Sequence, residues 1–384
     1  MARKRAKGEG TIRKRTDGLW EARLSVPGRR TPKSFYGKTQ AEALRKREEA
    51  KAQVDRGIDF DAGRLTLGEY MERWLSGPLK QSVWARTYED YAWLTRKHIT
   101  PALGHVKLKE LTAEHLDELY TQKSNSGLGA RTVNYIHSTI RVALQRAVKK
   151  RLIPYNVARD AEPPKQVQRE YTTLSQKQLA AFFKAAAEVG DRFEAFFIMA
   201  ALAGLRPGEL LALKWQDLKL PEGPGEAGEA MIRRSLSTTH DGPVFRETTK
   251  TGKGRAAYLL PPVVQALRAH RKRQLEEQLR FDGLRENHGL VFPSKTGTPM
   301  SANNLSRRHF KPLLKRTGLP DVRLYDLRHT FATLWLESRE HPKILQEILG
   351  HSRISVTLDT YSHVVPHMQR EAMGRFGERF TASS

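Results

Sequence analysis

Alternating apolar and polar positions over residues 10–36 predict short β-strands that each have one solvated face. The alternation covers three runs, 10–15, 19–26 and 31–36, and the pairs Asp17-Gly18 and Pro27-Gly28 between them are typical of turns. The next segment, 39–56, is rich in Ala, Glu, Lys and Arg and stops at Gly57, which predicts a helix with a glycine stop. We expect the helix to cover one face of this small sheet and to leave basic side chains exposed on the other.

From residue 65 the spacing changes to that of amphipathic helices. Over residues 67–75, apolar side chains recur at positions i, i+3, i+4, i+7 and i+8. The same periodicity marks the segments 87–97, 112–122 and 130–151. We therefore predict a bundle of four or five helices over residues 65–160.

In the remainder of the chain, segments with helical spacing of apolar residues alternate with strand-like segments. A helix is expected to begin at Pro207, and the other expected helices lie near 175–189, 191–203, 262–280, 302–316, 326–338 and 342–349. Expected strands lie near 230–237, 243–249 and 255–260. The predicted fold class is α+β multidomain, with linkers at 58–66 and 160–170. Its parts are a small three-stranded sheet plus helix (1–60), a helical bundle (65–160) and a mixed, mostly helical domain with a small antiparallel sheet (170–384).

The net charge of the chain indicates what kind of partner it binds. The chain has 67 Lys and Arg against 42 Asp and Glu, a net charge of +25, and an excess of this size indicates a polyanion such as nucleic acid. The basic face of the amino-terminal sheet could enter a DNA major groove, although an ordinary solvated sheet would show the same pattern. With no cysteine, the chain has no disulfide, thiolate nucleophile or cysteine-ligated zinc. No apolar run is long enough to span a membrane, and no signal peptide is recognisable, so we expect a cytoplasmic protein.

Arg206 is the first candidate for anion binding. It lies between Gly204, which ends an apolar helix, and Pro207, a favoured first helical residue. A helix amino terminus already favours an anion, and Glu209 can reach back to hold the guanidinium or to cap the helix. A buried, purely structural Arg–Glu pair would give the same local pattern.

Lys250 is a candidate proton donor. The segment 248–255 lies between two strand-like runs, which predicts a hairpin tip with this lysine at its base. A lysine ammonium can protonate a leaving alkoxide. The segment is not a phosphate-binding P-loop, because Glu247 and Gly254 stand where that motif needs Gly and Ser or Thr. A solvated loop is the alternative.

Arg328, His351 and Tyr361 form a constellation suited to phosphodiester chemistry. A guanidinium and an imidazole can hold phosphate oxygens while a phenol acts as nucleophile, and none of these steps needs a metal. Gly350 stops a predicted helix and places His351 just past its end. A zinc site built from His351 and His363 is the alternative, but their spacing matches no known His-pair pattern.

Four motifs occur in one order over the last part of the chain. They are Gly204-Leu205-Arg206-Pro207-Gly208-Glu209-Leu210, Lys250-Thr251 before Arg255, Asp326-Leu327-Arg328-His329-Thr330, and Leu349-Gly350-His351-Ser352 followed by Tyr361-Ser362-His363. In this order they resemble the tyrosine recombinases of the phage integrase family. The resemblance extends to the helical bundle, which is similar to the family's core-site binding domain, and to residues 1–57, which resemble the arm-binding domain of the larger integrases.

The resemblance implies a site-specific recombinase that cuts and rejoins DNA. Tyr361 is expected to form a 3′-phosphotyrosyl bond, and Lys250 to protonate the leaving 5′-oxygen. Three residues are expected to hold the non-bridging phosphate oxygens: Arg206, Arg328 and His351. The resemblance implies no cofactor and no metal. Its implied partners are double-stranded DNA with core and arm-type sites, a homo-tetramer assembled on that DNA, and accessory proteins that bend DNA or set direction.

Tyr325 departs from the family pattern. Family members commonly carry His or Lys three residues before the second arginine, and a phenol is a poor general base at neutral pH. Either Tyr325 only contacts phosphate, or removal of the Tyr361 proton falls to His351 or water. We expect the first. Two rival functions remain. One is a DNA-binding regulator that keeps the fold without the chemistry. The other is a metal-dependent nuclease, but this sequence lacks the clustered carboxylate set that such an enzyme needs.

Overall fold

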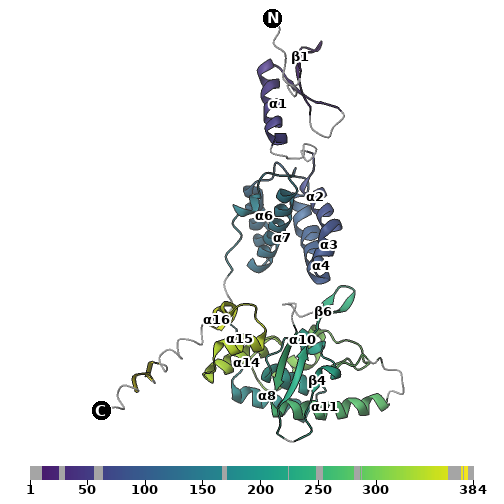
Figure 1. Cartoon of the computed structure of the whole chain (residues 1–384), viewed down its shortest axis with the longest axis vertical. Helices are drawn as coiled ribbons and strands as arrows, with labels where there is room; N and C mark the ends of the chain where they lie inside the picture. Colours follow the sequence, from purple (N-terminus) through teal and green to yellow (C-terminus); the bar gives the residue numbers. More distant parts are fainter. Residues whose placement is uncertain are drawn as a thin grey trace. The chain divides into compact units, whose positions relative to one another are not determined.

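The computed structural model divides into two compact units, Met1–Gln168 and Arg169–Ser384, and each is described by itself (Figure 1). The described residues are 11–25, 31–55, 64–166, 171–223, 225–247, 254–280, 286, 288–361, 373–374 and 376–378. The division at residue 168 falls in the linker predicted at 160–170. Several residues used in the sequence predictions lie outside the described residues: Pro27, Gly28, Gly57, Lys250, Thr251, Ser362 and His363.

The amino-terminal sheet and helix form as predicted. Strands β1 (Ile12–Lys14), β2 (Trp20–Leu24) and β3 (Lys33–Gly37) make an antiparallel sheet in that order. Helix α1 (Gln40–Asp55) packs against β2 and β3. Ala22 and Leu24 of β2 are buried, as are Ala43 and Ala50 of the helix, so small apolar side chains form the contact.

The other face of this sheet holds a carboxylate among its basic residues. Glu21 is buried, and its oxygens accept hydrogen bonds from Arg13 Nε (2.7 Å), Arg23 Nε (3.0 Å) and Ser34 Oγ (2.5 Å). These hydrogen bonds, that of Ser34 foremost, lower the pKa of Glu21 to about 2. The side chain of Arg13 is exposed, as predicted, and that of Arg23 is partly exposed, but ion pairs with Glu21 that the alternation pattern does not reveal hold both guanidiniums in place.

The helical bundle follows the predicted periodicity. Helix α2 (Leu67–Trp74) begins with a capping box between Thr66 and Glu69, and buries Leu67, Tyr70, Met71 and Trp74. Tyr70 Oη donates to the carbonyl of Ala143 in the last helix at 2.6 Å, which ties the two ends of the bundle together. The other helices are α3 (Lys80–Ser82), α4 (Ala85–Leu94), α5 (Thr100–Leu103), α6 (Ala113–Asn125) and α7 (Ala130–Lys149).

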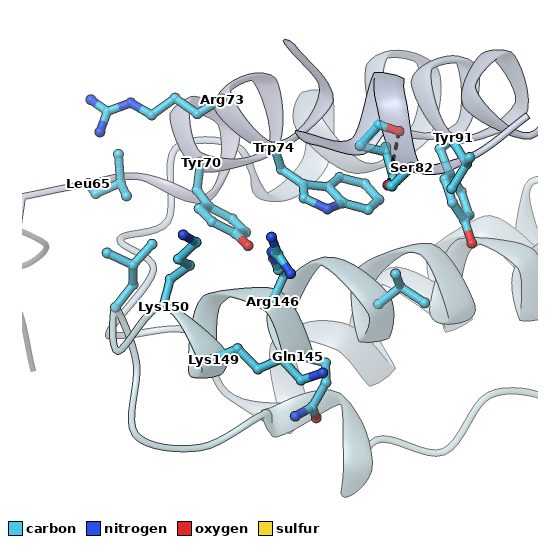
Figure 2. Close-up of a pocket in the computed structure, with 14 residues that line it drawn as sticks. Leu65, Tyr70, Arg73, Trp74, Ser82, Tyr91, Gln145, Arg146, Lys149 and Lys150 are labelled. Carbon is cyan, nitrogen blue, oxygen red and sulfur yellow. Dashed lines mark hydrogen bonds between the residues drawn. The ribbon is translucent and has the colours of Figure 1, made fainter. Parts of the chain in front are cut away.

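A pocket of about 500 Å³ opens in this bundle between α2 and α7 (Figure 2). Tyr70 and Trp74 extend from α2 towards Arg146 on α7. Apolar side chains such as Leu79 and Val83 line part of its wall, and basic side chains surround it: Arg73, Arg146, Lys149 and Lys150. Basic residues at the end of α7 therefore lie around an apolar hollow.

The second unit is mostly helical with two small antiparallel sheets. One sheet has the order β4-β5-β8, and the other pairs β6 with β7. The strands are β4 (Leu218–Lys219), β5 (Gly228–Ile232), β6 (Ser235–Thr239), β7 (Gly242–Arg246) and β8 (Arg255–Leu259). The helices are α8 (Gln176–Glu188), α9 (Glu194–Leu202), α10 (Pro207–Leu211), α11 (Pro261–Arg280), α12 (Ala302–Leu305), α13 (Lys311–Arg316), α14 (Asp326–Glu337), α15 (Pro342–Leu349) and α16 (Ile354–Tyr361).

Two predictions for the sheets were wrong. The single strand expected at 230–237 is two strands in different sheets, because the chain leaves the first sheet after Ile232 and the buried carboxylate of Asp217 pairs with Arg234. The hairpin predicted around 248–255 does not form, since its flanking strands pair elsewhere: β7 with β6 and β8 with β5. Residues 248–253 themselves lie outside the described residues. The mostly aliphatic core of the unit includes an aromatic cluster in which Phe182, Phe197 and Phe310 are in mutual contact.

Candidate functional site

Arg206 caps the amino terminus of α10, as the sequence predicts. Its backbone is extended, Pro207 is the first helical residue, and Glu209 Oε2 accepts from the Arg206 backbone N–H at 3.0 Å. The turn before it needs Gly204, which has φ +62°, and a Cβ there would lie 2.5 Å from Phe331 Cδ1. The glycine therefore lets α9 end against α14 and presents the arginine at the start of the next helix.

Replacing Gly204 with alanine is expected to destabilise the second unit by about 2–3 kcal/mol, because the positive φ is strained and the new methyl group displaces Phe331. Chemical denaturation measures the change. Gly190→Ala is the matched control, since Gly190 has φ +60° but no atom within 4 Å of an added Cβ. It should cost about 1 kcal/mol. Equal losses in both variants would show that the Phe331 contact contributes nothing.

Glu209 is the electrostatic centre of the site. Its buried carboxylate accepts a hydrogen bond from Arg206 Nη1 at 2.8 Å. It also accepts hydrogen bonds from Nη1 and Nη2 of Arg255 at 3.0 and 2.7 Å. Burial alone would raise the pKa of Glu209, but hydrogen bonds and charge from Arg255, and then the charge of Arg206, outweigh it and lower the pKa to about 2. The structure therefore contains the buried Arg–Glu pair that was one of the two alternatives, and anion binding by Arg206 stays a prediction.

Arg328 lies on α14 and is almost fully buried, with 1% of its surface exposed. Its Nη1 donates to the carbonyl of Gly204 at 2.8 Å and its Nη2 to that of Leu349 at 2.6 Å. Burial, followed by the nearby charge of Arg206, lowers the pKa of Arg328 to about 10, so the side chain stays cationic at neutral pH. The guanidinium is oriented before any ligand arrives.

Three arginines converge on the carboxyl end of α15. Arg255 Nε donates to the carbonyl of Ile348 at 3.1 Å, Arg328 Nη2 to that of Leu349, and Arg206 Nη2 to that of Gly350 at 3.4 Å. These carbonyls belong to the last turn of a helix, where backbone acceptors lack intrahelical partners and carry a partial negative charge. The helix end therefore holds the cations together.

His351 follows this helix end directly. Gly350 has φ +63° and caps the helix in the left-handed conformation, and a Cβ there would lie 3.0 Å from Arg255. The His351 Nδ1 contacts Thr357 Oγ1 of α16 at 2.8 Å. Burial, and then the charge of Arg328, lower the pKa of His351 to about 4. In the free protein the ring is therefore neutral and offers a hydrogen bond rather than a charge.

This electrostatic environment predicts that the His351 ring does not titrate between pH 5 and 8 in the DNA-free protein, whereas an exposed histidine titrates near pH 6.5. The ring proton resonances of His351, assigned through the His351→Gln spectrum, measure this. The same resonances in the chemically unfolded chain are the control. A midpoint in the folded protein near that of the unfolded chain would contradict the buried, cation-flanked site.

Tyr361 ends α16 and is buried, with 1% of its surface exposed. It packs with Leu345, Leu349 and Leu336 in a small cluster beside the arginines. Its Oη lies 2.9 Å from the Nδ1 of His329, the residue next to Arg328. Burial raises the pKa of Tyr361 and the charge of Arg328 offsets this only in part, so the phenol is protonated at neutral pH.

The structure brings together five of the predicted site residues: Arg206, Glu209, Arg328, His351 and Tyr361. Helices α14, α15 and α16, which carry or flank three of them (Arg328, His351 and Tyr361), lie close together (Figure 1). Tyr325 lies at the start of α14, 41% exposed, with its ring 5.4 Å from that of His329. The predicted proton donor Lys250 lies outside the described residues.

Sequence reasoning missed two residues of the site, Arg255 and His329. Arg255 stands inside one of the motifs, but its partners Glu209 and Ile348 are distant in sequence. His329 directly follows Arg328, and its contact with Tyr361 spans 32 residues. Over the described ranges, no three His, Cys, Asp or Glu side chains are grouped so that they could hold a metal ion, and no helix there is long and apolar enough to cross a bilayer.

Comparison with known proteins agrees with this geometry. Residues 172–368 match the model of the phage integrase family, and residues 66–124 match that of the phage integrase N-terminal SAM-like domain. An integrase of Streptomyces ambofaciens is 30% identical over 94% of this chain and 94% of its own length. A tyrosine recombinase XerC-like protein of Caldanaerobacter subterraneus subsp. tengcongensis is 28% identical, covering 92% and 93%. The Tn1549 transposon integrase in complex with transposon right end DNA shares the fold, with a TM-score of 0.68 at 21% identity over 81% of this chain and 99% of that one.

Proposed function

Since this chain belongs to the phage integrase family and is a site-specific tyrosine recombinase, we propose that it cuts and rejoins DNA through a covalent bond between Tyr361 and a 3′-phosphate. The observation that carries the proposal is the convergence of Arg206, Arg328 and the His351 turn at one helix end, beside a buried tyrosine. Fixed cationic donors next to a phenol suit phosphoryl transfer without a metal.

Each residue has a distinct role in this proposal. Arg206 and Arg328 bind the non-bridging oxygens and stabilise the charge that builds up on them, and His351 donates a hydrogen bond to one of them. Removing one preorganised donor of this kind costs about 10²–10³ in rate. Glu209 positions the arginines. Lys250 gives a proton to the leaving 5′-oxygen, and Tyr325 contacts the phosphate.

The covalent intermediate conserves the energy of the broken bond. A 5′-hydroxyl of a second strand attacks the phosphotyrosine and rejoins the DNA, so no nucleotide or other cofactor is consumed. The reaction class is strand transfer rather than hydrolysis, and it fits integration or excision of a phage or another mobile element.

The other parts of the chain supply DNA contacts. We assign residues 1–60 to arm-type sites, with Arg13 and Arg23 on the exposed sheet face, and residues 65–160 to the core site. Strand exchange between two duplexes needs four active sites, which a homo-tetramer on DNA provides. DNA-bending or directionality proteins are proposed as further partners. Because binding neutralises many phosphates, affinity should fall steeply with salt concentration.

The test is covalent trapping in EDTA. Core-site sequences are first selected from a random duplex pool, and the protein is then incubated with a duplex nicked next to the cleavage position, so that the released fragment diffuses away. A denaturation-stable protein–DNA adduct is expected, and peptide mass spectrometry should place the nucleotide on Tyr361. A DNA-binding regulator gives no adduct with the same duplex, and a metal-dependent nuclease gives neither adduct nor cleavage in EDTA.

A further inference from the structure

The nucleophile of this site needs a proton acceptor. Tyr361 is buried and its pKa is raised, so the phenol carries its proton at neutral pH. A phenol attacks phosphorus far better when a neighbouring base takes that proton. Tyr325, which stands where related proteins commonly carry His or Lys, is itself a phenol and a poor base.

His329 is within hydrogen-bond distance of the reacting atom. Its Nδ1 lies 2.9 Å from Tyr361 Oη, and both side chains are buried. The imidazole stacks on Tyr171, with ring centroids 3.9 Å apart and planes inclined at 26°. The ring of Tyr325, at the start of α14, lies 5.4 Å from the imidazole at an inclination of 57°. The imidazole therefore contacts two aromatic side chains, and one of its nitrogens lies within hydrogen-bond distance of the nucleophile.

The other bases of the described site are already occupied. The carboxylate of Glu209 is bound by Arg206 and Arg255, and its pKa of about 2 makes it a very weak base. Asp326 accepts from the backbone and side chain of Arg323. His351 directs its Nδ1 at Thr357. Among these groups, His329 is the one that contacts Tyr361.

We propose that His329 is the general base of the cleavage step. With its own proton on Nε2, the imidazole accepts the Tyr361 hydroxyl proton at Nδ1 while the phenol oxygen forms its bond to phosphorus. The bond between phosphorus and the 5′-oxygen breaks, and that oxygen leaves with a proton from a separate acid, the role assigned to Lys250. In the rejoining step the imidazolium returns its proton to Tyr361 as the phenol leaves. This inference rests on the proposed function.

The test is the rate of adduct formation by His329→Asn on two suicide substrates. The Asn Oδ1 can take the place of Nδ1 and accept the phenol hydrogen bond, but it cannot take the proton. One substrate is ordinary DNA, and the other carries sulfur at the 5′-bridging position, where a thiol leaving group needs little protonation. We expect the variant to be about 10²–10³-fold slower on both. His309→Asn is the control, since His309 is a half-buried histidine paired with Asp191 in the same unit; it should match wild type.

The pH dependence gives a second readout. The titratable neighbours of His329 are Tyr171, Tyr325 and Tyr361, with His351 and Arg328 close by. On the sulfur substrate the wild-type rate should fall at acid pH, because a protonated imidazole cannot accept the phenol proton. The acid decline should be absent from the residual rate of His329→Asn. If the variant does not fold, the wild-type profile still decides, and a rate independent of pH would overturn the proposal.

Other outcomes also count against the base. If the His329→Asn defect disappears on the sulfur substrate, His329 assists protonation of the leaving 5′-oxygen instead. If the variant is faster than wild type, the His329 contact holds Tyr361 back from reaction. If the rates of variant and wild type are equal, His329 has no role in cleavage. In each case wild type still forms its adduct, so the proposed function stands; absence of a wild-type adduct would defeat the proposed function itself.

Discussion

The Tyr361→Phe protein is expected to bind core-site DNA with wild-type affinity and to form no covalent adduct. The substitution removes one oxygen atom from a ring that packs against Leu345 and Leu349, so the fold and the arginine cluster are retained. Loss of an essential nucleophile lowers turnover by roughly 10⁶-fold in enzymes where it has been isolated. Trapping on the nicked duplex measures the adduct, and gel retardation measures the binding.

Tyr325→Phe is the matched control for that experiment. Both variants remove a phenol oxygen near the same histidine, but Tyr325 is 41% exposed and lies at the start of α14. We expect Tyr325→Phe to keep adduct formation, slowed by about 10-fold through the loss of one phosphate hydrogen bond. Complete loss of the adduct in Tyr325→Phe, as in Tyr361→Phe, would contradict the assignment of Tyr361 as the single nucleophile. It would also show that Tyr325 does more than contact the phosphate.

The Glu209→Ala protein is expected to lose about 3–5 kcal/mol of stability, because removing one partner of a buried ion pair leaves the others uncompensated. Here the remaining partners are Arg206 and Arg255, next to the buried Arg328. A loss of this size is a large part of the stability of an ordinary domain. Chemical denaturation of the full chain, followed by tryptophan fluorescence, measures it.

Glu347→Ala is the control for the Glu209 variant. Glu347 pairs with Lys343 on α15 in the same unit, but both side chains are more than half exposed. Exposed pairs of this kind contribute less than about 1 kcal/mol. A Glu209→Ala loss no greater than that of Glu347→Ala would mean that the carboxylate does not hold the cations together.

Glu209 also predicts how stability depends on pH. Its pKa is about 2 in the folded chain against an ordinary value of 4.5, so the ionised form is favoured by folding. The corresponding stabilisation, about 3 kcal/mol, is fully present above pH 4.5 and is lost as the pH falls towards 2. Glu209→Gln should remove this part of the acid dependence. An unchanged slope between pH 5 and 2 in the variant would contradict it.

Local patterns predicted the parts of this molecule better than their connections. Periods of two and of about 3.6 residues located β1–β3, the bundle helices and most helices of the second unit, because each pattern reflects which face of an element is buried. The pairing of β8 with β5 could not be read in the same way. It depends on contacts between segments more than 20 residues apart, and the nearer strand β7 has a similar pattern.

The same difference applies to the site. Arg206, Arg328, His351 and Tyr361 are recognisable because each stands in a short motif. Arg255 and His329 also stand in these motifs, but the fold creates their contacts, with Ile348 in one case and Tyr361 in the other. These contacts are therefore visible only when the helices carrying those partners are in place.

The meeting of three arginines at the end of α15 has a thermodynamic consequence for the reaction. In the proposed reaction, the carbonyls of residues 348–350 hold the guanidiniums before phosphate oxygens do, and they keep three like charges close together while no DNA is bound. The guanidiniums therefore do not have to be collected or reoriented when a phosphate arrives. The reorganisation energy that a solvent cage would demand is spent during folding, so little of it remains in the barrier to strand cleavage.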